Sequence, residues 1–482
     1  EYAHAMENSL GNFAEYIEVF HRYPNMAGGF IWDFIDQSIR RRTPDGDQWL
    51  YGGDFGDHPS HRYFCANGIL AADRQEHPSA REVFWGYRNL AVQGVDVRTG
   101  HYKLTNRHSF TDAERFTPHV EVLVAGETVA QEQLEPVPLA PWASTDWHVP
   151  EAVPPEAADV VVRFTFRSRE DRPAVPAGTV VAFDEFEIAR PATRPVAGGR
   201  VPTIRGDRVT AGSLQLEFDP VDGSLISWQV DGREVLATPL RRNYWRALTD
   251  NDRGFGNFDP RLQRWLIDTS WRDAAARVRQ HASGRVGDSL RVVFALRSRL
   301  FHRGLLWYDV HPDGTFDVHH ELVARKTMVR LGFTMELPEV QRIRWFGKGP
   351  HENYIDRNHG AWTAVHDLSL AELGHAYMRP QENGNRTRVR WLECRGPAGT
   401  LRAEDVTGGL LGFTAWPYTQ EALDAAEHRH ELVPTTGTTL NIDRQQRGVG
   451  GDIPGVAALL APYRMPAGRR YEVSMRLGFR PG

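Results

Sequence analysis

The stretch GNFAEYIEVFHRYPNMAGGFIWDF, residues 11–34, carries the pattern that decides the fold of the N-terminal part. Its first half repeats apolar residues at the helical period, which predicts a helix over 11–23 with one apolar face: Phe13, Tyr16, Ile17 and Phe20. Pro24 ends that pattern, and a glycine pair leads into the apolar run GGFIWDF (28–34), which predicts a buried parallel strand. A helix followed by a buried strand indicates an α/β architecture.

A second helix is predicted over 79–90, SAREVFWGYRNL, with Val83, Phe84 and Tyr87 on its apolar side. Helix, strand and later helix together predict that residues 1–90 form the C-terminal part of a (β/α)8 catalytic barrel. The strand that should precede the first helix is missing, which indicates a barrel cut in front of one of its strands.

After about residue 91 the apolar residues follow a period of two. Short runs at 119–126, 160–168 and 178–189 alternate or are continuously apolar, which predicts strands. About a hundred residues of this pattern predict an immunoglobulin-like β-sandwich over 91–190.

A segment rich in proline, glycine and arginine, 190–202, is predicted to be a linker. Beyond it, 203–482 is predicted to form a large antiparallel β-sandwich. Its strands are separated by turn signals, namely Asp222-Gly223, Asp231-Gly232 and Pro312-Asp313-Gly314. The whole chain is therefore expected to be multidomain and mostly β.

The composition excludes several classes of protein. The 482 residues are 25% charged and 41% hydrophobic, which is the balance of a folded globular protein. The net charge of -5 comes without a long basic block, so no nucleic-acid partner is expected. The longest apolar runs are too short for a membrane span, and no membrane partner is expected. Cys65 and Cys394 are far apart, which predicts no disulfide framework and a cytoplasmic location.

The common catalytic motifs for phosphate transfer, zinc hydrolysis and serine acylation do not occur in the sequence. Two histidine pairs, His428 with His430 and His319 with His320, are interpreted as structural or solvated, because a metal needs further ligands. Carboxylates are frequent in the barrel part, and Trp32 ends an apolar run there. A carboxylate beside an aromatic ring at the end of a barrel strand suggests sugar chemistry.

Longer segments show a resemblance to the LacZ-type β-galactosidases of glycoside hydrolase family 2. In the barrel part the similar segments are EYAHAMEN (1–8), GGFIWDFIDQS (28–38), YGGDFGD (51–57) and FCANGILAADR (64–74). In the C-terminal part they are RALTDNDRG (246–254), WFGKGPHENYIDR (345–357), PQENGNRTRVRW (380–391) and LNIDRQQRGVGGD (440–452). Their unbroken order along the chain implies the C-terminal half of such an enzyme, in which the large β-sandwich of 203–482 would be of the galactose-mutarotase-like kind.

The resemblance implies a retaining exo-glycosidase that hydrolyses terminal non-reducing β-D-galactose residues in β-galactosides. Glu1 matches the catalytic nucleophile, and the acid/base glutamate that retention also requires lies upstream of the matched segments. His4 matches a residue that lines the galactose pocket. Trp32 matches the ring beneath the sugar, where an aromatic face suits the apolar face of a pyranose.

The resemblance also implies two metal ions in the complete enzyme. The Phe64 carbonyl and the Asn67 side chain match two ligands of a sodium ion that holds the galactose 6-hydroxyl, so Asn67 also counts as substrate-binding. The third sodium ligand and the magnesium ligands lie outside this chain. Residues 247–256 match a mobile loop over the site entrance, and the full-length enzyme is expected to be a homo-oligomer.

Three departures from the family pattern affect these expectations. Glu7 stands where the family has glycine, whose backbone freedom a glutamate lacks, so Glu7 either disturbs the site or points outward. Thr439 replaces an aromatic residue that stacks on the departing sugar, which leaves the preference for lactose open. His61 replaces an aspartate near the sodium site.

Two other readings remain. The chain could be a non-catalytic β fragment that binds sugar or complements a partner fragment, and without its upstream half it is expected to be inactive. Within the enzyme class, a family 2 glycosidase of other specificity, such as a β-glucuronidase, is the alternative; the long C-terminal β domain favours the galactosidase. Asp33, Asp36, Asp54 and Asp57 are expected to order loops at the barrel rim.

Overall fold

The computed structural model describes the chain in six stretches, residues 2–44, 46–149, 159–188, 196–254, 267–451 and 459–482. These residues divide into two compact units, the first from 1–80, 193–358 and 366–482, the second from 81–192 and 359–365. Across the described stretches, no helix is both long enough and apolar enough to cross a membrane. The predicted fold class, multidomain and mostly β, is confirmed.

Helix α1 (Phe13–Arg22) confirms the helix predicted over 11–23. Phe13 and Ile17 are buried. The ring of Tyr2 packs against the predicted apolar face, with centroid distances of 6.1 Å to Phe13 and 5.1 Å to Phe20. The apolar spacing that predicted the helix therefore also provides the surface that joins it to the segment before it.

Three extended segments follow one another in parallel, as in a β/α barrel. Tyr2 forms a parallel bridge with Ile31, and Ile35 forms a parallel bridge with Leu70. The prediction of a buried strand over 28–34 was wrong, because the segment forms only an isolated bridge and Phe30 and Phe34 are 84% and 64% exposed. A barrel strand is buried when neighbours cover both of its faces, and the exposed Phe30 and Phe34 show that the face carrying these two rings is uncovered.

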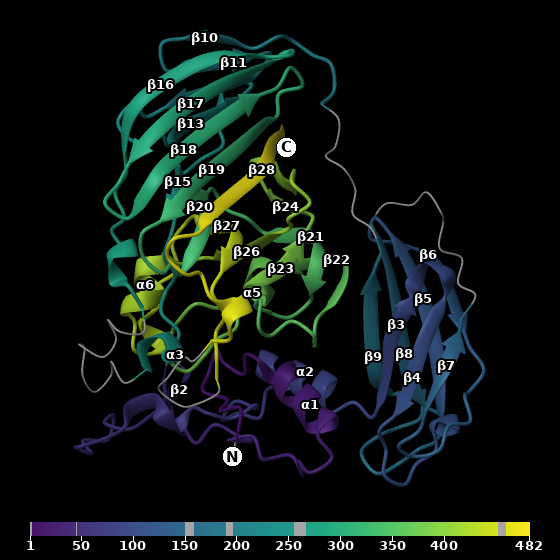
Figure 1. Cartoon of the computed structure of the whole chain (residues 1–482). Helices are drawn as coiled ribbons and strands as arrows, with labels where there is room; N and C mark the ends of the chain where they lie inside the picture. Colours follow the sequence, from purple (N-terminus) through teal and green to yellow (C-terminus); the bar gives the residue numbers. More distant parts are fainter. Residues whose placement is uncertain (1, 45, 150–158, 189–195, 255–266, 452–458) are drawn as a thin grey trace. The chain divides into compact units, whose positions relative to one another are not determined.

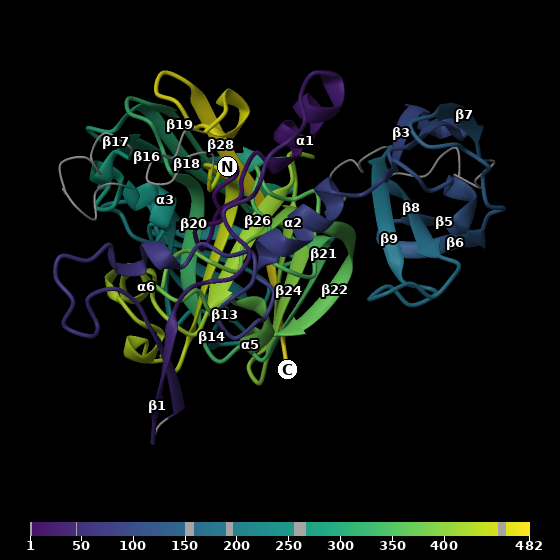
Figure 2. The ribbon, with the colours of Figure 1, turned by 90° about the horizontal axis from the view of Figure 1, so that it is seen from below.

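The remaining elements of the N-terminal part are short. Strands β1 (Ile39–Thr43) and β2 (Gly46–Leu50) form an antiparallel hairpin, and β1 projects from the rest of the first unit (Figure 2). A 3-10 turn, η1 (Arg62–Cys65), precedes the third parallel segment.

Helix α2 (Pro78–Gly86) is shorter than the helix predicted over 79–90. Val83 is buried as expected, but Phe84 and Tyr87 are 36% and 49% exposed, so the prediction of their burial was wrong. The helix ends at Gly86 and the chain becomes a strand at Leu90, so the helical period does not continue through Tyr87.

The second unit contains a β-sandwich. Its three-stranded sheet has the order β3 (Leu90–Asp96), β4 (His101–Asn106), β7 (Ser144–His148). Its four-stranded sheet has the order β6 (Glu127–Gln133), β5 (Phe116–Val124), β8 (Val160–Ser168), β9 (Val180–Glu187). One apolar core takes side chains from both sheets, including Tyr102 and Phe164. The three strands predicted from alternation correspond to β5, β8 and β9.

The large C-terminal sandwich belongs to the first unit and is built from a ten-stranded and a nine-stranded sheet (Figure 1). The ten-stranded sheet contains β10 (Thr203–Arg205), β11 (Arg208–Ala211), β12 (Leu214–Phe218), β13 (Leu225–Val230), β14 (Arg233–Glu234), β15 (Thr238–Asn243), β20 (Arg330–Leu337), β27 (Thr438–Gln446), β26 (Leu411–Trp416) and β23 (Arg386–Val389). The other contains β16 (Arg277–Val286), β17 (Ser289–Arg297), β18 (Phe301–Val310), β19 (Phe316–Ala324), β28 (Arg470–Pro481), β25 (Gly399–Asp405), β24 (Trp391–Gly396), β21 (Arg342–Gly349) and β22 (Trp362–Ser369).

Side chains from both large sheets form one continuous core. The predicted turns lie between strands as expected. Asp231 and Gly232, for example, form a two-residue turn between β13 and β14 with φ values of 51° and 75°, the left-handed angles that such a hairpin needs. In the described stretches the short helices are α3 (Asp250–Arg253), α5 (Leu370–Leu373) and α6 (Gln420–Ala425), and the other 3-10 turns are η2 (Val97–Thr99), η3 (Ala113–Arg115), η5 (Thr269–Trp271), η6 (Arg429–Glu431) and η7 (Ala461–Tyr463).

Buried hydrogen bonds hold the N-terminal segment against the end of the large sandwich. The Asn8 side chain donates to the Glu382 carbonyl at 2.7 Å, and Arg357 donates to the Ser9 carbonyl at 2.7 Å. These bonds join residues more than 340 positions apart, so they position the N-terminal segment within the first unit.

Candidate functional site

The predicted site residues that the structure describes lie on adjacent parallel segments. The Ala5 N–H donates to the Trp32 carbonyl at 2.8 Å, and the Asp33 N–H donates to the Asn67 carbonyl at 2.6 Å. His4, Trp32 and Asn67 are therefore brought to one edge of this small parallel array. Glu1, the predicted nucleophile, lies outside the described residues.

His4 is buried beside Phe64, with 5.5 Å between the ring centroids. Burial lowers the pKa of His4 to about 4, because an imidazolium there would lose its hydration. The ring is therefore neutral near pH 7. Its Nδ1 atom has no hydrogen-bond partner among the residues that the structure describes. A neutral ring with an unpaired nitrogen is suited to hydrogen bonding with a hydroxyl group.

Trp32 is 45% exposed, although tryptophan usually buries most of its surface. Its backbone is fixed, because its carbonyl accepts from Ala5 and the next residue pairs with Asn67. An exposed indole on a fixed backbone provides an apolar platform with a polar edge, which is the surface that a pyranose ring stacks on.

Phe64 and Asn67, the predicted sodium ligands, are hydrogen-bonded to each other through the Phe64 carbonyl, which accepts from the Asn67 side chain. The Asn67 Nδ2 atom lies 2.9 Å from the Phe64 carbonyl oxygen. The Asn67 Oδ1 atom is buried and has no partner within the described part of the chain. Carbonyl and amide oxygens are the donors that hard cations prefer, so these two residues fit a sodium ion.

Glu7 does not point outward, which corrects one of the two expectations for this residue. It is fully buried, and both of its carboxylate oxygens accept from the Met378 N–H at 3.0 Å. Its φ is 53°, the left-handed region that the family's glycine would favour. Burial, with the nearby Asp36 and Asp250 carboxylates, raises its pKa well above the usual value, while Arg429 opposes this.

A buried network fixes the third parallel segment. The Asp36 Oδ1 atom accepts from the Gly68 N–H at 2.8 Å, and Asp36 Oδ2 lies 2.8 Å from His77 Nε2. The other His77 nitrogen lies 2.8 Å from His375 Nε2. Burial lowers the pKa of His375 well below its usual value, so that ring is neutral. Asp36 thus orders the loop that carries Asn67.

Two other rim carboxylates also hold loops. Asp54 Oδ2 accepts from the Tyr51 N–H at 2.8 Å, and Asp57 Oδ1 accepts from the Gly53 N–H at 3.0 Å. These bonds close successive turns of the segment after β2. Their role is to shape the loop rather than to contact a reacting group.

The described part of the predicted entrance loop, 247–254, is anchored rather than loosely held. Arg246 forms two hydrogen bonds to Asp252, at 2.8 and 3.0 Å, and both side chains are buried. Asp250 is buried as well and accepts from Arg379 at 3.2 Å. Because breaking a buried ion pair is costly, these contacts anchor this part of the segment, and its mobility stays a prediction. Residues 255–256 lie outside the described residues.

The structure also places two of the family departures. Thr439 is 8% exposed and lies in β27 opposite Trp416, so it offers a sugar no aromatic surface. The His61 ring lies 6.1 Å from the Phe64 ring, close to the predicted sodium ligands. A large cavity of about 1180 Å³ lies elsewhere in the first unit, along β16, β17 and β18, and contains none of the predicted site residues.

Three family models match successive parts of the chain. Residues 1–92 match "Glycosyl hydrolases family 2, TIM barrel domain", and 102–189 match "Beta-galactosidase, domain 4". Residues 210–477, more than half of the chain, match "Beta galactosidase small chain".

Two curated relatives, each named beta-galactosidase, align with nearly the whole chain. The protein of Priestia megaterium is 32% identical over 499 residues, which cover 99% of this chain and 47% of the relative. The protein of Vibrio cholerae is 33% identical over 483 residues, which cover 94% of this chain and 45% of the relative. This chain thus spans about half the length of these relatives.

A solved structure, the GalM/aldose epimerase homologue from C. elegans, aligns with 59% of this chain and 99% of its own, at 9% identity and a TM-score of 0.28. A score that low carries no argument about function or fold.

Proposed function

Because this chain belongs to the β-galactosidases of glycoside hydrolase family 2, we propose that it is the C-terminal portion of a retaining exo-β-galactosidase. Its substrate would be the terminal non-reducing β-D-galactose of a β-galactoside. The observation that carries the proposal is the parallel array that sets His4, Trp32 and Asn67 side by side. It supports a sugar pocket at the edge where a barrel keeps its chemistry.

In this mechanism the Glu1 carboxylate attacks the anomeric carbon and forms a galactosyl ester as the aglycone oxygen departs. A second carboxyl group about 5–5.5 Å away protonates that oxygen and later takes a proton from the attacking water. We assign this acid/base group to the portion of the enzyme that precedes this chain. The chain by itself would then bind sugar without cleaving it.

His4 and Trp32 would hold the sugar ring. The pKa of His4, about 4, leaves the imidazole neutral, so it would bond a galactose hydroxyl without placing a charge in the pocket. The exposed indole of Trp32 would stack on the apolar face of the ring. Together they would orient the anomeric carbon toward the nucleophile.

The sodium ion expected from the family would be held by the Phe64 carbonyl and the Asn67 side chain, with a third ligand from outside this chain. When bound, it would fix the galactose 6-hydroxyl. The buried, partnerless Asn67 Oδ1 supports this assignment. The magnesium ligands would also come from outside this chain.

A second function, as a complementing fragment, is supported by an exposed apolar row. Phe30 and Phe34 lie four residues apart along one extended segment and are 84% and 64% exposed. Side chains that point to one face of an extended segment form a surface that further barrel strands would cover. This function is compatible with the first, because the covering strands would also bring the acid/base group.

The test is to assay the full-length protein against a panel of nitrophenyl glycosides. We expect hydrolysis of the β-galactoside in preference to the β-glucuronide and β-glucoside. Glu1→Gln should abolish turnover, because the amide is not a nucleophile, and should leave the circular dichroism spectrum unchanged. Turnover by Glu1→Gln at the native rate would exclude Glu1 from this role. A preference for the β-glucuronide would replace the proposed substrate.

A further inference from the structure

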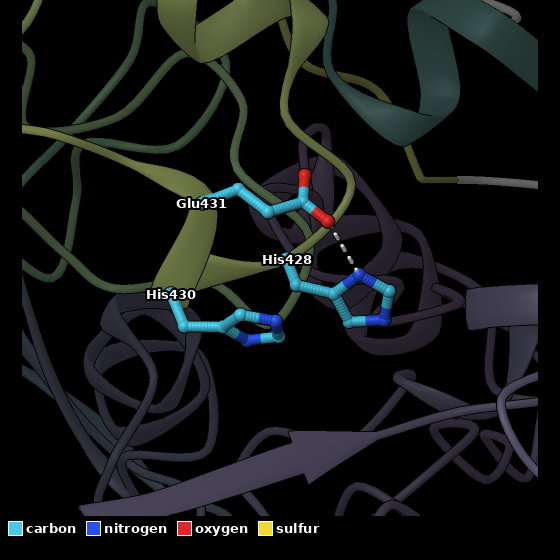
Figure 3. Close-up of side chains that lie close together, drawn as sticks. All are labelled: His428, His430 and Glu431. Carbon is cyan, nitrogen blue, oxygen red and sulfur yellow. Dashed lines mark hydrogen bonds and ion pairs between the residues drawn. The ribbon is translucent and has the colours of Figure 1, made fainter. Parts of the chain in front are cut away.

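A cluster of potential metal ligands lies far from the sugar-binding residues in the sequence. His428, His430 and Glu431 lie at and just before η6, and their side chains gather on one side of this turn (Figure 3). One ligand atom from each residue lies within 4.8 Å of the others. The sequence shows two of these histidines, but their spacing alone did not reveal a third ligand.

Neighbouring residues fix the orientation of His428. Its Nε2 atom lies 2.9 Å from Asp54 Oδ2, and its ring stacks on Tyr51 with 4.6 Å between centroids and 7° between planes. A carboxylate that accepts the N–H of one imidazole nitrogen leaves the other nitrogen with a free lone pair. This pairing of carboxylate and histidine is the arrangement that orients histidine ligands in metal sites.

The second nitrogen of His428 faces another acceptor. Its Nδ1 atom lies 3.1 Å from Glu431 Oε1, as the dashed line in Figure 3 shows. If Nε2 carries the proton toward Asp54, two lone pairs face each other, and a cation between them relieves the repulsion. Two atoms bound at about 2.0–2.2 Å to a tetrahedral metal lie about 3.3 Å apart, so this pair is spaced for chelation.

His430 completes the set. Its ring centroid lies 5.3 Å from that of His428, and one of its ring nitrogens lies within 4.8 Å of the ligand atoms of His428 and Glu431. Two imidazoles and one carboxylate are a ligand set typical of zinc, with one position left for water.

We propose that His428, His430 and Glu431 bind a divalent transition-metal cation of the zinc class, with Asp54 as the residue that orients His428. The site joins the turn after α6 to the loop after β2, because Tyr51 and Asp54 come from that loop. The bound cation therefore raises the stability of this contact within the first unit. The proposal is independent of glycosidase activity.

The test uses the whole 482-residue chain, stripped with a chelator and titrated with Co²⁺ and then Zn²⁺. We expect one Co²⁺ per chain with a tetrahedral visible spectrum, displacement of Co²⁺ by Zn²⁺, and a rise in melting temperature with Zn²⁺. His430→Gln and Glu431→Gln should each weaken Zn²⁺ binding at least about tenfold, and Asp54→Asn about 10–100-fold.

Two exposed residues outside the cluster provide matched controls. His281→Gln and Glu421→Gln should bind Zn²⁺ as the native chain does. Equal affinity in the native chain, His430→Gln and Glu431→Gln would overturn the proposal, as would the absence of a Co²⁺ spectrum. Because His430 and Glu431 are exposed, loss of the fold does not obscure these comparisons.

Discussion

At the scale of single residues, Glu7 shows how one substitution is accommodated. It adopts a φ of 53°, which disfavours any side chain, but its carboxylate binds the Met378 N–H with both oxygens. A buried carboxylate near two others is disfavoured when ionised. The hydrogen bond from Met378 therefore stabilises the glutamate at this position, while the neighbouring carboxylates destabilise its ionised form.

Glu7→Gln should stabilise the chain at neutral pH. The folded-state pKa of Glu7 is raised, so the native chain holds a proton more tightly than the unfolded chain and loses stability as pH rises through that pKa. Glutamine keeps an acceptor for Met378 and does not ionise. We expect a gain of about 1–3 kcal/mol in unfolding free energy at pH 7.5, which disappears near pH 4. Urea unfolding of the native chain and of Glu7→Gln between about pH 4 and pH 7.5 measures this gain, and the exposed Glu421→Gln is the control. If Glu7→Gln were less stable than the native chain at every pH, the prediction would be contradicted.

Trp32→Ala in the full-length enzyme should weaken galactose binding by about 1–3 kcal/mol, because stacking on the indole is lost. The measurement is the inhibition constant of galactose. Trp142 is also exposed, at 65%, but lies in the second unit, so Trp142→Ala serves as the matched control and should leave that constant unchanged. An unchanged constant in Trp32→Ala would remove the platform role.

At the scale of elements, the short helix α3 depends on polar contacts more than on its own residues. Thr249 caps it and accepts from the Asp252 N–H, while Asp252 also pairs with Arg246. Four residues do not form a stable helix in isolation. The buried ion pair therefore fixes this element and the strand end before it.

Arg246→Ala should lower the unfolding free energy by about 3–5 kcal/mol, because Asp252 is left buried without its partner. The exposed cross-strand pair Arg208–Glu217, with side chains 58% and 39% exposed, is the comparison. Arg208→Ala should cost less than about 1 kcal/mol. Denaturant unfolding measures the loss of unfolding free energy in Arg246→Ala and in Arg208→Ala. Equal small losses would show that α3 is held by other contacts.

At the scale of the whole molecule, each compact unit has its own apolar core. Phe164 lies at the centre of the second core, fully buried and 4.7 Å from the Tyr102 ring. Separate cores allow the units to unfold separately. We therefore expect two calorimetric transitions.

Phe164→Ala should lower one transition only, by about 3–5 kcal/mol of unfolding free energy, because the cavity it leaves is confined to the second core. The other transition serves as the internal control. Differential scanning calorimetry distinguishes the outcomes. A single transition that moves as a whole would show that the units unfold cooperatively.

Much of the fold followed from local pattern. Alternation placed β5, β8 and β9, and glycine-containing dipeptides placed turns such as Asp231-Gly232, because side-chain direction and backbone angle are properties of neighbouring residues. The incorrect predictions concerned which apolar residues are buried. The apolar run at 28–34 gave no sign that Phe30 would be exposed, because exposure depends on which other segments cover it.

The candidate site was predictable through family resemblance more than through pattern. No local feature connects His4, Trp32 and Asn67, which the backbone pairing of three separate segments brings together. Glu7 was noticed as a departure, but its partner Met378 lies 371 residues further on.

The sequence alone determined the kinds of element, their order and the family, because these depend on composition, periodicity and motif order along the chain. The tertiary structure alone decided which charges are buried together, such as Arg246 with Asp252, and which histidines face a carboxylate, such as His428. Burial and electrostatic partners depend on distances between residues far apart in sequence. Such distances exist only after the chain has folded.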